Sequence, residues 1–193
     1  MSRSRLVLAQ DPDADELLGR DPFALLVGML LDQQFPMERA FAGPALIAQR
    51  LGVDRLDPAR IAAEPPETFA AVMAGPPAVH RYPQSMAERV QALAALVVDR
   101  YDGDASALWR EATTGADLLA RLLALPGFGA QKAKIFLALL GKQLEVTPQG
   151  WQEAAGDYAS PGFRSVADVV DAESLQKVRE HKKAVKAQAG PKQ

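Results

Sequence analysis

The chain contains no cysteine and only two histidines, His80 and His181, in 193 residues. The lack of cysteine excludes disulfides, zinc–thiolate sites, cysteine nucleophiles and iron–sulfur clusters. Two histidines are too few for a histidine-rich metal centre. We therefore expect no metal and no cofactor, and a fold held by an apolar core, for which the chain is long enough.

Long apolar runs are also missing. The longest, residues 22–31, is too short to span a bilayer, and the apolar stretch at the N-terminus is too short for the core of a signal peptide. We therefore expect a cytoplasmic protein that does not bind membranes.

Neither sign of charge dominates, since 22 Lys and Arg stand against 24 Asp and Glu. A net charge of −2 provides no general attraction to nucleic acid, so any DNA binding must depend on local arrangement. Residues 130–144 contain three lysines and no acid, and residues 176–193 contain Glu180 as their single acid among many cations. A solvated tail and a DNA-contacting arm both remain open for the basic C-terminal end.

Strand-like alternation is absent apart from a short extended fragment at residues 6–8, so the sequence predicts an all-α fold. Asp21-Pro22 is typical of a helix start, and the helix over 22–34 has no polar face, which places it at the centre of the core. The other predicted helices cover 36–52 (interrupted near Gly43-Pro44), two short segments opening at Asp57-Pro58 and Pro65-Pro66, 84–101, 106–112, 116–124, 130–140, and more weakly 151–158, 165–170 and 173–186.

The most informative segment is Leu125-Pro126-Gly127-Phe128-Gly129, which joins two of the predicted helices. Two glycines this close allow a very short turn that folds one helix back against the next. The free N–H groups of the turn and of the following helix then converge and attract an anion. With Lys132 nearby, a DNA phosphate suits the site, held without reading the base sequence. A plain helical hairpin is the alternative.

Residues 125–133 resemble the helix-hairpin-helix of the HhH-GPD superfamily of base-excision DNA glycosylases, in particular the actinobacterial-type HhH-GPD proteins. Leu30-Leu31-Asp32-Gln33-Gln34 resembles the family's helix that ends in a glutamine pair. Residues 83–90 resemble the helix start that precedes the hairpin. The order and separation of the three segments agree, so the resemblance covers about residues 20–160.

The resemblance implies a single two-lobed unit with duplex DNA bound across the cleft. One lobe would comprise about residues 25–130 and end in the hairpin (116–140), and the other would combine 1–24 with about 131–193. A damaged nucleotide would rotate out of the duplex, and Gln34 would fill the gap. The resemblance also allows a monovalent cation at the hairpin. The implied DNA contacts are Gln34, Pro126, Gly127, Phe128, Gly129, Gln131 and Lys132.

The sequence departs from the family at the catalytic positions. The resemblance places the usual aspartate at Gln149 and the Schiff-base lysine of bifunctional members at Gln131, with Lys132 about 100° around the helix. A neutral amide orients water but does not accept its proton, and loss of a general base costs ~10²–10⁴ in rate. Lyase chemistry is therefore disfavoured. Three ways remain open: another carboxylate enters the cleft, the substrate needs little catalytic help, or the protein binds damaged DNA without cutting it. The candidate carboxylates are Asp32 first, then Glu153 and Asp157.

A base that is already positively charged, such as an alkylated purine, leaves more readily and stacks well on aromatic faces. Candidate residues for a base pocket are Gln33, Tyr82 and Trp151, with Trp109 and Tyr158 as further aromatic walls, although a place in the core is the alternative for each aromatic. The loop His80-Arg81-Tyr82 offers a contact to DNA or to the extruded base, without the arrangement of a hydrolase triad.

These features together predict a monomeric base-excision DNA repair protein, associated with the nucleoid when bound to DNA. The predicted activity is that of a monofunctional DNA N-glycosylase for damaged bases, without lyase activity. Two alternatives remain open. The first is a catalytically silent module that binds damaged DNA, and the second is a helical protein-interaction domain that keeps the hairpin only as a turn.

Overall fold

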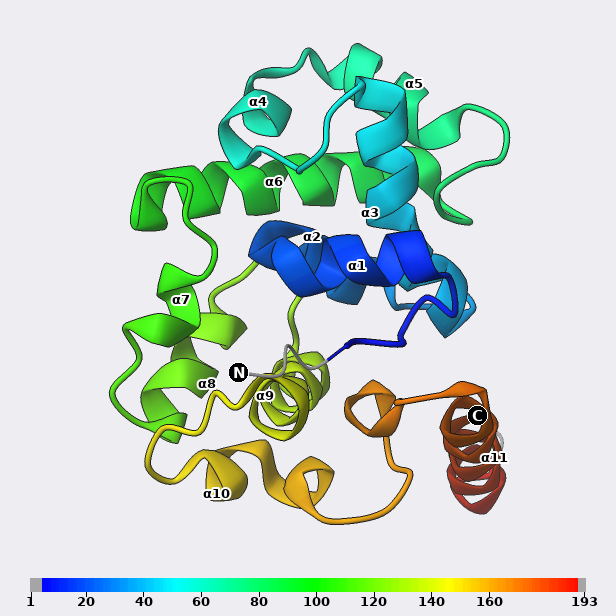
Figure 1. The fold of residues 1–193 in the computed structure, drawn as a ribbon, viewed down its shortest axis with the longest axis vertical. Helices are drawn as coiled ribbons and strands as arrows, with labels where there is room; N and C mark the ends of the chain where they lie inside the picture. Colours follow the sequence, from blue (N-terminus) through cyan, green and yellow to red (C-terminus); the bar gives the residue numbers. More distant parts are fainter. Residues whose placement is uncertain (1–4, 191–193) are drawn as a thin grey trace.

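The computed structural model of the chain describes residues 5–190, and every regular element in this range is helical (Figure 1). The all-α class is therefore confirmed for the described range. Residues 1–4 and 191–193, including Lys192 of the basic end, lie outside the described residues. The elements are α1 (Pro12–Arg20), α2 (Pro22–Leu31), α3 (Met37–Leu51), α4 (Pro58–Ala63), α5 (Pro66–Ala74), α6 (Pro83–Tyr101), α7 (Ala107–Arg110), α8 (Gly115–Leu123), α9 (Ala130–Leu144), α10 (Trp151–Ala155), the 3-10 helices η1 (Gly156–Ala159) and η2 (Val166–Asp168), and α11 (Ala172–Gln188).

Aspartate–proline pairs define the start of three helices. Asp21 caps α2 by accepting hydrogen bonds from the amides of Phe23 and Ala24. Asp11 and Asp57 cap α1 and α4 in a similar way. Proline suits the next position because it has no N–H to satisfy and its φ is already helical. The predicted starts of α2 and α4 are confirmed, whereas α1 is missing from the predicted helices although its Asp-Pro signal is the same.

Helix α2 lies in the core, with residues 23–31 all buried, as its lack of a polar face predicts. It ends at Leu31, three residues earlier than predicted, because the backbone leaves the helical region at Asp32 (ψ 68°) and Gln34 has a φ of 51°. Gln33 and Gln34 therefore lie in a turn and not on the helix. No helix within residues 5–190 is both long enough and apolar enough to cross a membrane.

The predicted interruption at Gly43-Pro44 is wrong, because α3 continues from Met37 to Leu51 with Pro44 inside it. Proline in a helix interior removes one backbone hydrogen bond and costs ~3 kcal/mol, so packing must compensate. Both residues are buried, and a Cβ atom at Gly43 would lie 2.7 Å from Leu31 Cδ1. The tight packing of α3 on α2 therefore keeps the helix continuous.

Three of the helices predicted after α6 are shorter or divided, whereas α9 and α11 run longer than predicted, to Leu144 and Gln188. Helix α7 has a single turn, and the helix predicted over 151–158 divides into α10 and η1 at Gly156, whose φ of 63° and ψ of −140° do not belong to a helix. The segment predicted over 165–170 contains only η2, which begins with a capping box between Ser165 and Asp168. Residues 6–8 are not part of a strand, although Leu6 and Leu8 are buried.

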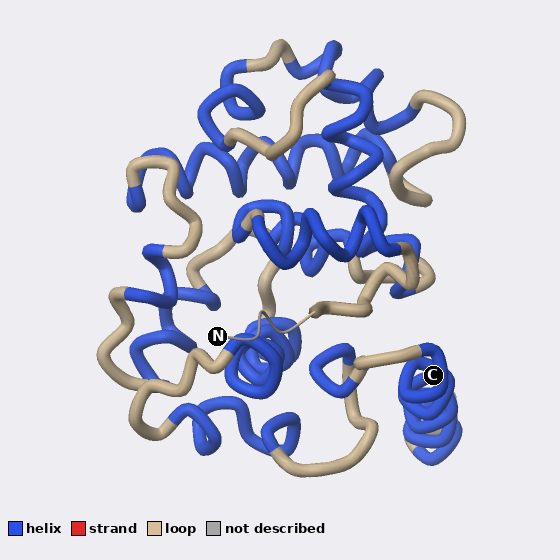
Figure 2. Tube along the Cα trace, in the orientation of Figure 1, coloured by secondary structure: helices blue, strands red, loops and turns tan. Residues whose placement is uncertain are grey.

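The helices form two groups (Figures 1 and 2). In the first group, α4 and α5 pack on the long α6, and α1, α2 and α3 pack on one another. In the second, α9 contacts α8, α10, η1 and η2, and α11 packs beside η2. Helix α1, which the expected division into lobes places with the C-terminal helices, contacts α2 and α3. The α8–α9 hairpin faces the end of α2, which is where the two groups meet.

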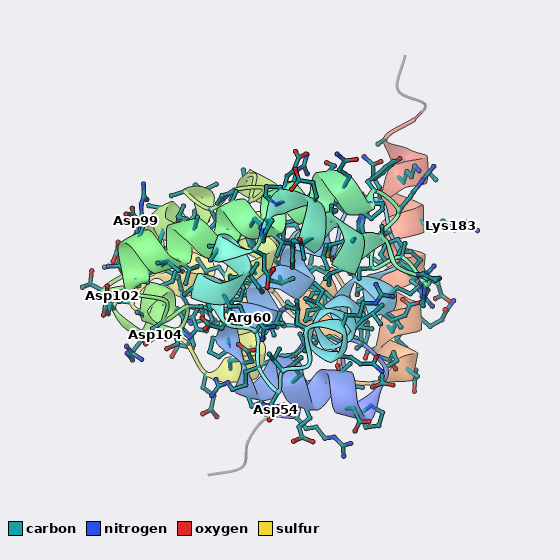
Figure 3. The ribbon with its side chains drawn as sticks, turned by 90° about the horizontal axis from the view of Figure 1, so that it is seen from above. Asp54, Arg60, Asp99, Asp102, Asp104 and Lys183 are labelled. Carbon is teal, nitrogen blue, oxygen red and sulfur yellow. The ribbon has the colours of Figure 1, made fainter. Side chains whose placement is uncertain are left out.

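Lys183 of the basic C-terminal end lies at one edge of the molecule. Figure 3 shows it on the outer side of α11, with Asp99, Asp102 and Asp104 at the opposite edge. From Arg179 to Gly190 every residue of the C-terminal end is exposed. The basic half of α11 is therefore open to solvent along its described length.

Candidate nucleic-acid interface

The turn between α8 and α9 needs glycine at position 127. Gly127 has a φ of 78°, and a Cβ atom there would lie 2.4 Å from Leu30 Cδ1. The amide of Phe128 closes the turn by donating to the Leu125 carbonyl at 3.1 Å. The Phe128 side chain is buried and meets Phe136 edge to face, with ring centroids 6.1 Å apart. The hairpin apex therefore packs directly against the end of α2.

Most backbone amides of this turn and of the first turn of α9 have no acceptor. Among the residues that the structure describes, no carbonyl or side chain accepts a hydrogen bond from the amides of Gly127, Gly129, Ala130, Gln131 or Lys132. All of these residues except Lys132 are exposed. Free N–H groups at the positive end of a 15-residue helix form an anion-binding surface. The predicted anion site is therefore accessible.

The glutamine pair lies beside the hairpin. The carbonyl of Leu30 accepts one hydrogen bond from Lys132 Nζ at 2.9 Å and another from Gln33 Nε2 at 3.1 Å. Arg89 of α6 donates from Nη1 to Gln33 Oε1 at 3.2 Å, and its Cδ lies 4.0 Å from the position of a Cβ at Gly127. The three segments that carry the family resemblance therefore meet at one place.

Gln34 is held in a strained and exposed conformation. Its φ of 51° is in the left-handed region, which costs a non-glycine residue ~1 kcal/mol or more. Its side chain makes no hydrogen bond to the described residues. It borders an open hollow of about 420 Å³ whose other lining residues are Phe35, Pro36, Arg39, Ala78, His80 and Arg81.

His80 stabilises the turn that contains Gln33 and Gln34 through a hydrogen bond. Its Nδ1 accepts a hydrogen bond from the amide of Tyr82 at 3.0 Å, so Nε2 carries the proton and donates to the Gln33 carbonyl at 3.0 Å. The ring is buried and lies 4.7 Å from the Phe35 ring, and this burial lowers the pKa of His80. His80 therefore positions the turn, while Tyr82 remains exposed next to Arg81.

Asp32 and Lys132 lie in a low-dielectric region where the hairpin faces the end of α2. Burial raises the pKa of Asp32, and the charges of Lys182 and Lys132 partly oppose this effect. Burial also lowers the pKa of Lys132 to about 8, opposed by Asp32 and reinforced by Arg89. An acid and an amine whose pKa values both move toward neutrality suit proton transfer.

Helix α11 completes the surroundings of Asp32 through an ion pair. Arg179 Nη2 lies 2.5 Å from Glu38 Oε1 at the start of α3. The other oxygen of Glu38 is buried without a partner among the described residues, and its charge adds to the rise in the pKa of Asp32. Sequence reasoning missed Glu38, Arg89 and Lys182, and of these only Arg89 lies in a segment that carries the resemblance.

Gln149 and Trp151 do not lie beside Asp32 and the hairpin turn. The carbonyl of Gln149 accepts from the Gly115 amide at 2.8 Å, at the start of α8. The Trp151 ring packs on Gly141, where a Cβ would lie 2.3 Å from it. Gly141 comes nine residues after Lys132 in α9, about 13 Å along the helix axis. Both residues therefore lie toward the far end of α9 from the hairpin turn. Glu153 lines a groove along α8 that extends from Thr114 to Leu123.

The two neighbours Gln131 and Lys132 point to different sides of α9. Gln131 is exposed and donates from Nε2 to Tyr158 Oη at 3.0 Å, next to Asp157. Lys132 is half-buried and points to α2. Trp109 packs edge to face on Phe136. Of the predicted pocket residues, only Gln33 lies beside Asp32, and Tyr82 lies near His80, with ring centroids 6.0 Å apart.

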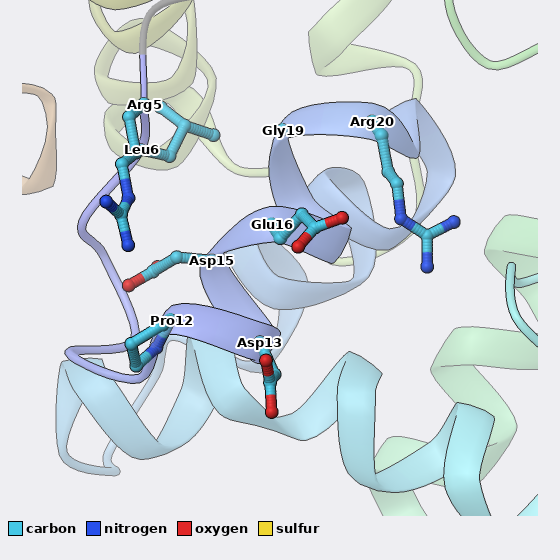
Figure 4. Close-up of a pocket in the computed structure, with 8 residues that line it drawn as sticks. All are labelled: Arg5, Leu6, Pro12, Asp13, Asp15, Glu16, Gly19 and Arg20. Carbon is cyan, nitrogen blue, oxygen red and sulfur yellow. The ribbon is translucent and has the colours of Figure 1, made fainter.

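A separate hollow of about 250 Å³ lies between α1 and the N-terminal segment (Figure 4). Asp15 points into it and accepts hydrogen bonds from the amides of Leu8 and Ala9, at 2.8 and 2.7 Å. Its other carboxylates belong to Asp13 and Glu16. Arg5 and Arg20 also line this hollow. Residues 5–190 contain no group of three or more His, Asp or Glu side chains arranged to hold a metal ion.

Comparisons with protein-family models, with curated proteins and with solved structures find no match to this chain.

Proposed function

We propose that the protein is an HhH-GPD-type base-excision DNA repair protein that binds duplex DNA as a monomer. The observation that carries the proposal is the group of unpaired amides of Gly127, Gly129, Ala130 and Gln131, four exposed residues beside the Gln33-Gln34 turn. Phosphate oxygens accept from such amides, and the positive end of α9 stabilises their charge. Contacts of this kind position the protein on any sequence.

Gln34 is the residue that enters the duplex. Rotation of a nucleotide out of the helix costs a few kcal/mol, least for a damaged or mispaired base. The exposed amide of Gln34 can bond the orphaned partner base, while its aliphatic stem fills the vacated stack. A strained φ supported by His80 through Gln33 holds this side chain out from the surface.

Asp32 is the carboxylate of the proposed monofunctional N-glycosylase. The reaction breaks the bond between the sugar and the base, and the base leaves with the bonding electrons. A water molecule attacks the oxocarbenium-like sugar, and its proton passes to Asp32. Burial raises the pKa of Asp32 and so makes it a stronger base. Alkylated purines, which leave without prior protonation, are the preferred substrate class.

Binding is tested with a proline substitution that removes one free amide. Ala130 is the first residue of α9 and follows Gly129 with a ψ of 179°, so Ala130→Pro fits the backbone and deletes only an N–H. Ala172→Pro at the first residue of α11 is the matched control, since Asp171 has a ψ of −179°. We expect Ala130→Pro to weaken binding to an abasic-site duplex, measured by fluorescence anisotropy, and the control to leave it unchanged.

Catalysis is tested with alkylated, uracil-containing and hypoxanthine-containing duplexes. We expect wild-type protein to release base from at least one of them, and Asp32→Asn to reduce the rate ~100-fold or more with binding retained. Salt-dependent binding without release from any duplex would identify a silent damage-binding module. Absence of salt-dependent binding would leave a helical protein-interaction domain.

A further inference from the structure

A basic pocket lies between α9, η1 and α11, away from the α8–α9 hairpin turn. It has a volume of about 330 Å³, and its charged or titratable lining residues are Lys134, Asp157, Tyr158, Arg164 and His181. Lys134 and Arg164 provide two cationic groups against the single carboxylate of Asp157. The hollow therefore has an excess of positive charge.

Arg164 is the group in this pocket with unused hydrogen-bonding capacity. Its Nε is buried and has no hydrogen-bond partner among the described residues. The nearby carboxylate of Asp168 is already engaged, because it pairs with Lys142 Nζ at 2.6 Å and accepts from the amide of Arg164 at 2.8 Å. A buried donor without a partner is unfavourable, so a hydrogen-bond acceptor brought next to the Arg164 guanidinium would be favoured.

The pocket is continuous with the hairpin surface. Tyr158 of its lining accepts a hydrogen bond from Gln131, in the first turn of α9. Lys134 comes three residues after Gln131, on the same face of the helix. It lies about 7.5 Å along the axis from Gly129.

We propose that this pocket binds a phosphate group through Arg164 and Lys134. The guanidinium presents planar N–H donors that match phosphate oxygens, and Lys134 adds a second positive charge. The phosphate can belong to the DNA strand that continues from the hairpin or to a free phosphate ester. The inference stands on this pocket alone and does not require DNA to bind at the hairpin.

The test follows the Nε–Hε resonance of Arg164 in a ¹⁵N-correlated NMR spectrum during titration with inorganic phosphate. We expect a saturable shift with phosphate, and none with sodium chloride at the same ionic strength. Lys134→Gln should weaken this binding at least threefold, whereas Lys183→Gln, on the outer side of α11, should leave it unchanged. An Arg164 resonance that does not respond to phosphate overturns the proposal.

The salt dependence of DNA affinity distinguishes the two sources of the phosphate. If the strand supplies it, Arg164→Gln and Lys134→Gln each lower the slope of log affinity against log salt by about 1, alike for all duplex sequences. If both variants bind DNA as wild type while inorganic phosphate still shifts Arg164, the ligand is a free phosphate ester. If the protein binds no duplex but Arg164 still responds to phosphate, the pocket proposal is supported and the DNA-binding proposal is rejected. The two proposals can therefore fail separately.

Discussion

Lys132 Nζ donates a hydrogen bond of 2.9 Å to the backbone carbonyl of Leu30, a residue 102 positions earlier in the chain. The acceptor lies in the last turn of α2, where carbonyl groups have no partner within the helix. The donor lies in the first turn of α9. This one bond therefore joins the negative end of one helix to the start of another, and it holds the hairpin against the glutamine turn.

The buried position of Lys132 predicts a specific dependence of stability on pH. Its pKa is about 8 in the folded protein and 10.5 in an exposed lysine, so the unfolded state binds more protons between these values. The free energy of unfolding should therefore rise with pH from about 8 to 10.5, relative to Lys132→Met, which keeps the apolar stem. Urea denaturation at intervals from pH 7.5 to 10.5 measures the difference. A difference that stays constant over this range would contradict the shifted pKa.

Gly127 and Gly129 should respond very differently to alanine. At Gly127 the φ of 78° and the 2.4 Å approach to Leu30 both oppose a side chain, so Gly127→Ala should lower the free energy of unfolding by about 2–4 kcal/mol. Gly129 has a φ of −76°, and no atom lies within 4 Å of the place that a Cβ would take, so Gly129→Ala should change it by less than about 0.5 kcal/mol. Thermal unfolding of the two variants compares them directly, and equal effects would refute the packing account.

Gln34 should show opposite effects on stability and on binding. Gln34→Gly removes the strain of the left-handed backbone and should raise the free energy of unfolding, or leave it unchanged, within about 1 kcal/mol. The same change removes the side chain that fills the duplex, so affinity for an abasic-site duplex should fall at least severalfold. Glu145 has a φ of 58°, is exposed and lies at the other end of α9, which makes Glu145→Gly the matched control for strain. Unchanged DNA affinity in Gln34→Gly would exclude Gln34 as the inserted residue.

His80 should make the protein sensitive to mild acid. Its pKa is lowered in the folded state, so the unfolded state takes up the proton first as pH falls through 6.5. The contribution of His80 is therefore fully present above pH 6.5 and is lost as pH falls toward the folded-state pKa. His80→Gln does not titrate, so its midpoint of thermal unfolding should change less between pH 7.5 and 5 than that of the wild type. An equal change in both proteins would show that other groups cause the acid sensitivity.

Local signals in the sequence were sufficient for much of the fold. Asp21-Pro22 predicts the start of α2 because cap and proline act within a single turn. The glycine spacing at 127–129 predicts the hairpin because a positive φ is a local requirement. The continuity of α3 through Pro44 was beyond such signals, because it depends on the contact of Gly43 with Leu31 of another helix.

The candidate site likewise contains residues that short motifs reveal and a residue whose position they do not. Gln34, Lys132 and Asp32 could be singled out from short motifs, but the position of Gln149 depends on a loop that returns the chain to Gly115. The number of residues between Gly129 and Gln149 does not reveal where this loop leads the chain.

The amino-acid sequence by itself determined the helical class, most helix starts and the glycine turn, because each follows from backbone preferences within a few residues. Only the tertiary structure decided which charged side chains share one environment, as Lys132 does with Asp32 and Arg179 with Glu38. The reason is physical. The pKa of a side chain depends on which other groups are removed from water with it, and packing brings such groups together from positions a hundred or more residues apart.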